Sequence, residues 1–277
     1  MTQLIRPFDP WKSPLCTCRE KYSLNPYTGC AHGCLYCYST YIPDFYKLRL
    51  KKRLEQRVEI DLKKIPEKSL ISISNSSDPY PPVERKLEKT RNILRLLRDY
   101  NMRIMIVTKS DMVCRDVDLL DKGAVSISIT TLRDEVASLI EPGAPNPEKR
   151  IKALQRLKES GIPVILRLDP ILPGLTEGEV EKIIEKCSFA DHIVSSTLKL
   201  RYDSFKRLKN ISGEVYRRLY FIEGEKIRNS FYMPTEIRRN ILDKVKKICE
   251  EFGLSYAFCR EGFNFRAESC DGSHLIP

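Results

Sequence analysis

Three closely spaced cysteines near the start of the sequence are the residues best suited to chemistry. Cys30, Cys34 and Cys37 lie in the segment Asn-Pro-Tyr-Thr-Gly-Cys-Ala-His-Gly-Cys-Leu-Tyr-Cys, which begins at Asn25. Thiolates at this spacing can bind three irons of a 4Fe–4S cubane, leaving the fourth iron open to a substrate or cofactor. Glycines before Cys30 and Cys34 permit the tight turns that such a loop needs. Structural zinc is the alternative, although zinc usually takes paired C-x-x-C units and four ligands.

A second set of cysteines lies at the two ends of the chain. Cys16 and Cys18 precede the first loop, and Cys259 and Cys270 lie in the tail. Because the ends of a domain often meet, these four thiols can form a complete ligand set. We predict that they hold a second 4Fe–4S cluster, with a zinc ion or ordinary buried thiols as the alternatives.

The tail also contains the string Cys270-Asp-Gly-Ser-His274. The string resembles CDGSH-type proteins, in which three cysteines and one histidine hold a 2Fe–2S cluster. In those proteins the ligands lie close together in sequence, whereas here Cys18 and Cys270 are far apart. We therefore favour the four-cysteine set, with His274 as a substitute ligand.

Strand-like and helix-like patterns alternate through the middle of the chain and must position these cysteines. Six apolar or β-branched runs predict strands, and amphipathic stretches with short connections separate them. This alternation is typical of an α/β fold with a parallel sheet. The predicted strands are Lys21–Asn25, Leu70–Ser74, Arg103–Thr108, Ala124–Thr130, Pro163–Asp169 and His192–Leu198. The predicted helices are Val83–Tyr100, Pro147–Ser160, Thr176–Lys186 (with a capping box from Thr176 to Glu179) and Thr235–Phe252, followed by a short strand at Leu254–Phe258.

The cysteine loop, with Tyr36 before its last cysteine and a strand ahead of it, resembles the radical S-adenosylmethionine (SAM) superfamily. Further segments resemble the spore photoproduct lyase-like branch, which includes archaeal proteins described as DNA repair photolyases. These segments are Asn25–Cys30, Ser77–Glu84, Thr108–Ser110, Glu141–Glu148 and Leu168–Leu175. The resemblance implies a partial TIM-type (β/α)6 barrel with cysteine-bearing N- and C-terminal extensions, and chemistry at the carboxyl ends of the strands.

The resemblance also implies a reaction. The cluster reductively cleaves bound SAM, and the resulting 5′-deoxyadenosyl radical abstracts hydrogen from a substrate. By position along the barrel, Tyr36 would contact the adenine, and Ser76, Ser77 and Asp78 would lie near the SAM amino group. Lys109 would pair with the SAM carboxylate. Ser128 and Thr130, on one face of a strand, would face the ribose, and Arg167 would contact cofactor or substrate.

These features divide the chain into three expected parts. Residues 1–20 form an N-terminal extension with the cysteine pair, residues 21–200 form the barrel core, and residues 201–277 form a helical region with the cysteine-containing tail. The chain is 42% hydrophobic and 31% charged, which favours a globular protein over a disordered one. Apolar runs are too short for a membrane span, and the start lacks a secretory pattern. We expect a cytoplasmic protein with no membrane partner.

The balance of charge bears on the substrate. The chain has 48 Lys and Arg against 37 Asp and Glu, a net charge of +11. There are two basic stretches, Tyr46–Lys68, which looks like a helix followed by a short strand, and Lys199–Arg239. The aromatic residues interspersed in them are Tyr46, Tyr202, Phe205, Tyr216, Tyr220, Phe231 and Tyr232. This pattern favours nucleic acid as the substrate, for DNA repair or RNA modification. The alternatives are a radical SAM enzyme acting on a peptide or small metabolite, and a non-catalytic iron–sulfur protein. A reductant such as ferredoxin or flavodoxin is the expected partner. Cys114, a candidate hydrogen donor, is expected to be structural.

Overall fold

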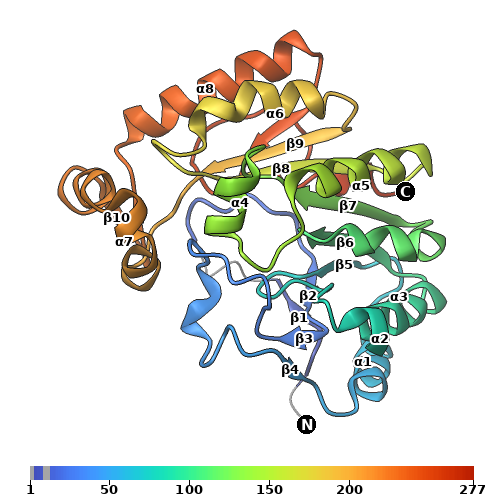
Figure 1. Ribbon diagram of the computed structural model, residues 1–277. Helices are drawn as coiled ribbons and strands as arrows, with labels where there is room; N and C mark the ends of the chain where they lie inside the picture. The colour runs from blue at the N-terminus through green and yellow to red at the C-terminus, as the bar shows by residue number, and fades with distance from the viewer. Residues whose placement is uncertain (1–2, 9–12) are drawn as a thin grey trace.

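A computed structural model describes residues 3–8 and 13–277, and its centre is one open sheet (Figure 1). The strand order is β1-β2-β5-β6-β7-β8-β9-β12, with parallel pairing throughout except between β1 and β2. In the described part of the chain, no pairing joins β1 to β12, so the expected barrel is partial. The strands are β1 (Arg6–Pro7), β2 (Tyr22–Leu24), β5 (Leu70–Ile73), β6 (Arg103–Thr108), β7 (Gly123–Ser128), β8 (Val164–Ile171), β9 (His192–Thr197) and β12 (Tyr256–Phe258).

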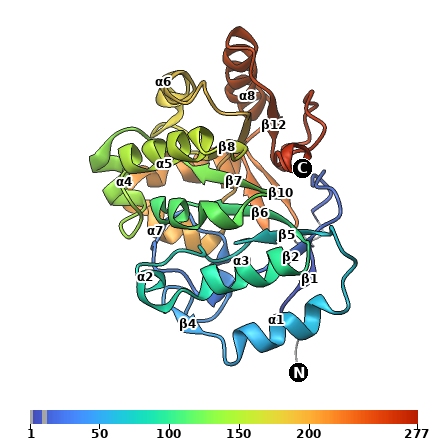
Figure 2. The ribbon, with the colours of Figure 1, turned by 90° about the vertical axis from the view of Figure 1, so that its right-hand side faces the viewer.

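Helices cover the outer face of the curved sheet, as Figures 1 and 2 show. They bury apolar side chains against the strands, for example Ile93, Leu94 and Leu97 of α3. The helices are α1 (Leu54–Leu62), α2 (Glu84–Leu87), α3 (Lys89–Asp99), α4 (Asp134–Ile140), α5 (Pro147–Glu159), α6 (Val180–Lys186), α7 (Tyr202–Tyr216) and α8 (Thr235–Glu251). The described residues also contain one π-helix, η4 (Arg217–Ile222), and the 3₁₀ helices η1 (Ser39–Tyr41), η2 (Asp111–Leu119), η3 (Glu177–Glu179) and η5 (Ser273–Leu275). Two small antiparallel sheets in the described residues lie outside the main sheet: β3 (Tyr27–Thr28) with β4 (Arg49–Leu50), and the hairpin of β10 (Glu225–Ile227) with β11 (Ser230–Tyr232).

Side-chain alternation along the strands separates the core from the functional face. On β6, Ile104 and Ile106 pack in the main core under the helices, whereas Met105 between them faces the concave side. There it contributes to a small cluster with Ile276 near the C-terminus. The concave face is therefore available to polar side chains further along each strand.

The six predicted strands are confirmed as β2 and β5–β9. The short strand predicted at Leu254–Phe258 is confirmed as β12, which is two residues shorter. The single helix predicted over Val83–Tyr100 is wrong, because the chain breaks at Glu88 with φ 47°. The Glu84 carboxylate accepts the backbone N–H groups of Thr90 and Arg91, and so caps a new helix, α3.

Two further local predictions are corrected. The 46–68 region, expected as a helix followed by a strand, has the reverse order, with β4 before α1. The predicted capping box at Thr176 is absent, because its hydroxyl accepts the Leu172 N–H and Glu179 instead binds Thr131 and the Leu132 N–H. Within the described residues, no helix combines the length and apolar character required to cross a bilayer.

Candidate iron–sulfur and SAM site

The loop that carries Cys30, Cys34 and Cys37 is held by backbone contacts on two sides. The Cys30 N–H donates to the Phe45 carbonyl over 2.7 Å, and the Leu35 N–H donates to the Ile140 carbonyl over 2.9 Å. Gly29 has φ +82°, and a Cβ there would lie 2.5 Å from the Lys47 carbonyl oxygen. Only glycine allows this close approach, which confirms the role predicted for it.

Arg207 of α7 holds the same loop from a third side. Its guanidinium donates to the Leu35 carbonyl over 2.8 Å and to the Cys37 carbonyl over 2.7 Å. Tyr46 donates its hydroxyl to the Cys34 carbonyl over 2.9 Å. These contacts fix the carbonyls of Cys34, Leu35 and Cys37, and so hold the backbone of the cysteine loop in place.

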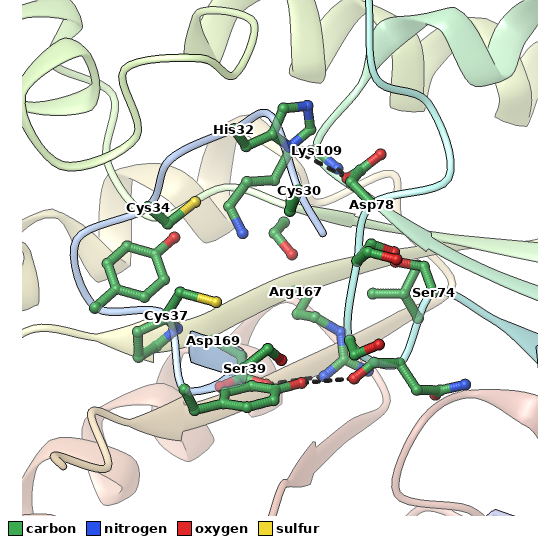
Figure 3. A pocket seen from close by; sticks show the side chains of 18 of the residues that line it. Cys30, His32, Cys34, Cys37, Ser39, Ser74, Asp78, Lys109, Arg167 and Asp169 are labelled. Carbon is green, nitrogen blue, oxygen red and sulfur yellow. Dashed lines mark hydrogen bonds and ion pairs between the residues drawn. The ribbon is translucent and has the colours of Figure 1, made fainter. Parts of the chain in front are cut away.

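All three thiols line a cavity of about 180 Å³ at the carboxyl ends of the strands (Figure 3). Burial raises the pKa of Cys30 to about 11 and raises the pKa values of Cys34 and Cys37 as well. Binding iron would therefore displace three protons. Three thiols converging on one cavity are the donor set that a 4Fe–4S cluster with one open iron requires.

The polar loop after β5 forms the opposite wall of the cavity. The side-chain oxygen of Asn25 accepts the backbone N–H groups of Asn75, Ser76 and Ser77 over 3.1, 3.1 and 3.4 Å. Ser77 donates its hydroxyl to the Tyr27 carbonyl. The segment that includes Asn25 thus fixes this loop as well as leading into the cysteine loop, a role that the sequence analysis missed.

Asp78 closes this wall against β6. Its carboxylate accepts the Thr108 hydroxyl and the Lys109 N–H, each over 2.8 Å, and lies 3.4 Å from Nδ1 of His32. Burial is the main cause that lowers the pKa of His32, which is buried in the cysteine loop. Asp78 therefore connects the cysteine loop, the polar loop and β6.

Lys109 and Tyr36 share a buried carboxylate, Glu141. Tyr36 donates its hydroxyl to Glu141, and Nζ of Lys109 lies 3.8 Å from the same carboxylate and 5.6 Å from the centre of the Tyr36 ring. Arg150 forms an ion pair with Glu141 at 2.5 Å. Burial alone would lower the pKa of Lys109, but Glu141 and Cys34 raise it. The cavity therefore contains a charged ammonium at neutral pH.

Apart from Thr130, every residue predicted for SAM binding lines the cavity. The Thr130 hydroxyl donates to Glu141 over 2.8 Å, so it supports the buried carboxylate instead. Ser128 and Arg167 both line the cavity, and the Arg167 guanidinium lies 2.9 Å from the Asp169 carboxylate and 3.2 Å from the Ser126 hydroxyl. Burial alone would raise the pKa of Asp169, but the Arg167 charge lowers it, so this pair stays charged.

The four remaining predicted ligands line a second cavity of about 330 Å³, and Cys18 and Cys270 have their sulfurs 3.3 Å apart. Hydrogen bonds from Cys16 and Cys270 lower the pKa of Cys18 to about 3. Within residues 3–8 and 13–277, no three His, Cys, Asp or Glu side chains converge closely enough for one metal ion. Cys114 packs in the main core with its thiol near the Ala153 carbonyl, as predicted for a structural cysteine.

The partial barrel and the three-cysteine loop at its carboxyl edge define an enzyme built around an iron–sulfur cluster and SAM. Residues 24–187 match the family described as the radical SAM superfamily, so the chain belongs to that superfamily and is a radical SAM enzyme.

The chain is similar to an uncharacterized archaeal protein and, in fold, to several solved structures. An uncharacterized protein of Methanocaldococcus jannaschii is 35% identical over 184 residues, which cover 63% of this chain and 68% of that protein. A mutant of spore photoproduct lyase, solved with bound AdoMet and dinucleoside spore photoproduct, has a TM-score of 0.67 at 15% identity and covers 88% of this chain and 76% of its own. Streptococcus suis SuiB bound to its precursor peptide SuiA has a TM-score of 0.58 at 14% identity, covering 85% and 48%. At these identities the two structures show the fold alone.

Proposed function

We propose that this enzyme cleaves SAM reductively at the Cys30–Cys34–Cys37 loop and abstracts a hydrogen atom from a nucleic acid, in DNA repair or RNA modification. The observation that carries the radical step is the single cavity that contains the three thiols, the charged Lys109 and the polar loop after β5. When bound, the cluster and SAM supply the 5′-deoxyadenosyl radical. The protein supplies binding, orientation and exclusion of water.

The residues of the cavity have distinct proposed roles. Lys109 pairs with the SAM carboxylate, since an ammonium acts as a compact point charge. The backbone and hydroxyls of the Ser76–Asp78 segment face the amino group. Tyr36 lies along the adenine, with its hydroxyl held by Glu141, and Ser128 faces the ribose. Arg167, which lines this cavity and the second one beneath it, contacts the substrate.

Cationic side chains beside the cavity support a nucleic acid substrate. A small hollow next to it is lined by Arg201, Arg228 and Arg260, and the Arg228 turn joins the largely exposed strand β10 to β11. The net charge of +11 favours the same class of partner. One structural neighbour was solved with a dinucleoside lesion. The aromatic residues give less support than expected, because Tyr216, Tyr220 and Tyr232 are buried and cannot stack on bases. Tyr202, which is 64% exposed, can.

Product analysis tests the radical step. Anaerobic protein given dithionite and SAM should release 5′-deoxyadenosine, and a Cys30→Ala/Cys34→Ala/Cys37→Ala variant should release none. An intact cluster in the wild type without product would instead support the non-catalytic alternative. Deuterium transfer from labelled nucleic acid into 5′-deoxyadenosine would identify the hydrogen source.

Salt dependence tests the substrate class. Each phosphate contact contributes about −0.9 to the slope of log affinity against log salt for duplex DNA. Lys226→Glu/Arg228→Glu should make this slope shallower, whereas Lys247→Glu on the exposed face of α8 should not. Weak, salt-insensitive binding would favour a peptide or small metabolite, and the peptide-bound SuiB structure is the neighbour that favours this second candidate.

The proposal includes a low-potential electron donor of the ferredoxin or flavodoxin class and a cytoplasmic location, where thiols remain reduced. SAM cleavage does not depend on a second 4Fe–4S cluster. Such a cluster at Cys16, Cys18, Cys259 and Cys270 therefore rests on its own observations.

A further inference from the structure

Four cysteines from three separate segments gather beneath the SAM cavity. Cys16 and Cys18 come from the segment before β2, Cys259 follows β12, and Cys270 lies in the tail. All four line one cavity of about 330 Å³. The early chain and the tail lie side by side in Figure 2, and the Cys18–Cys270 sulfur contact joins them over 252 residues of sequence. Such convergence is unexpected for thiols that serve only as small core residues.

The fold fixes these segments without help from a metal. Lys21 and Asp271 form an ion pair that is almost fully buried, with 4% and 8% of their side chains exposed. Gly272 has φ +80°, and a Cβ there would lie 2.6 Å from Ile165, so the turn after Cys270 fits tightly against the sheet. The Cys259 N–H donates to the Ser195 carbonyl over 2.8 Å, which sets Cys259 at the end of its strand.

The second cavity continues into the first. Arg167, Asp169 and Arg260 line both. The inward-facing residues of β6 give the order: Met105 lines only the lower cavity, Val107 lines both, and Lys109 at the strand end lines only the upper one. The cavity that contains the four thiols therefore reaches further toward the amino end of β6, and it forms the floor of the chamber whose roof is the SAM site.

The ligand chemistry favours a cluster over a single ion. A cubane spreads four thiolates over four separate irons, whereas zinc draws them to about 2.3 Å from one centre. In the part of the chain that is described, no three such ligands converge on one ion, either here or at the Cys30 loop, for which we propose a cubane. Arg167, Arg260 and Lys21 line the lower cavity and would offset the negative charge of four thiolates.

His274 is held elsewhere. Its Nδ1 is hydrogen-bonded to the Ser269 hydroxyl over 2.8 Å, and its ring packs edge-on against buried His192. The tail therefore presents Cys270 to the cavity while His274 is occupied. This arrangement favours four cysteines over a set of three cysteines and one histidine.

We propose that Cys16, Cys18, Cys259 and Cys270 hold a second 4Fe–4S cluster that forms the floor of the substrate chamber. Because the protein would ligate all four irons, SAM has no open iron there, and the cluster would accept or donate one electron without a change in its ligands. A substrate bound between the two cysteine sets would lie next to both. This proposal does not depend on which substrate is used.

Iron and sulfide analysis of anaerobically reconstituted protein tests the site. We expect about eight irons per chain for the wild type, about four for Cys30→Ala/Cys34→Ala/Cys37→Ala and about four for Cys16→Ala/Cys270→Ala. The matched control is Cys187→Ala/Cys249→Ala, which removes two fully buried core thiols and should keep about eight irons.

Electron paramagnetic resonance after dithionite reduction separates this proposal from the previous one. SAM should perturb the signal of Cys16→Ala/Cys270→Ala and leave that of the Cys30 triple variant unchanged. A triple variant that binds no iron, or that binds one zinc ion instead, would overturn the second cluster. Failure of SAM cleavage in the wild type would not, because the triple variant reports the second site alone.

Discussion

Glu141→Gln removes a buried negative charge that faces two cations. Arg150 lies 2.5 Å from the Glu141 carboxylate, and the two side chains are 1% and 0% exposed, so water screens this pair very little. Lys109 lies 3.8 Å away from the same group. Removing one partner of such a buried pair leaves an uncompensated charge, which typically costs about 3–5 kcal/mol. We expect a loss of that size in the free energy of unfolding.

Denaturant unfolding of the apoprotein at neutral pH measures this loss, with the slope of the transition checked for constancy. A second variant separates charge from packing. Glu141→Gln/Arg150→Met removes the Glu141 carboxylate together with the Arg150 guanidinium, while Lys109 remains. This variant should recover more than half of the loss, because no unpaired guanidinium remains. A single-variant loss below about 1 kcal/mol, or a double variant as unstable as the single, would refute this account of the Glu141 site.

The pH dependence provides an independent check on Glu141. Burial would raise the pKa of Glu141, but Arg150 and Lys109 together hold it below its usual value of 4.5. Its contribution to stability is therefore complete above the unfolded pKa and is lost as pH falls through the lower folded pKa. The difference between wild type and Glu141→Gln should stay constant from about pH 6 to 8 and shrink only in acid. A difference that grows in acid would contradict the assignment.

Three further substitutions test how the cysteine loop and the polar loop are held. Gly29→Ala should abolish cluster binding because its Cβ would meet two backbone carbonyls. The control is Gly253→Ala, which is also at positive φ but has no atom within 4 Å of its Cβ. It should keep its full iron content and lose about 1 kcal/mol in the free energy of unfolding. Arg207→Ala removes two hydrogen bonds to loop carbonyls and should speed iron loss to a chelator several-fold. The control is Arg218→Ala, whose side chain is 65% exposed and which should leave the rate of iron loss unchanged. Asn25→Ala should weaken SAM binding by about 1–3 kcal/mol in an equilibrium titration, because three backbone N–H groups lose their acceptor, and unchanged affinity would show that the loop needs no such support.

Local sequence signals predicted the strands well and singled out the cysteine loop, whose role as a cluster site stays a prediction. The three cysteines of this loop lie within eight residues, and the strands are continuous apolar runs, so both can be recognised from the local sequence. The break at Glu88 was hidden because the amphipathic period continues across it, and the carboxylate that caps the second helix comes from Glu84 of the helix before it.

The supports of the site were hidden for a different reason. Tyr36 meets Glu141 across 105 residues of sequence, and Arg207 meets Leu35 across 172. No local period encodes such contacts. A signal did exist for Glu141 and Asn25, since both lie in the segments that resemble the spore photoproduct lyase-like branch. The four outer cysteines were predicted to meet from their number and type, and the buried Lys21–Asp271 pair explains how they do.

The size of the chamber constrains what can react in it. The upper and lower cavities measure about 180 and 330 Å³, and only the two together are of the size typical of small-molecule sites. A duplex cannot enter a space of this size, so a nucleic acid would have to present a single nucleotide turned out of its stack. The basic side chains at Arg201 and Arg228 lie beside the chamber rather than within the lower cavity, where they would contact the phosphates of neighbouring nucleotides. Specificity would then come from the inner walls, above all from Arg167 and Asp169, and affinity from the exposed cations outside.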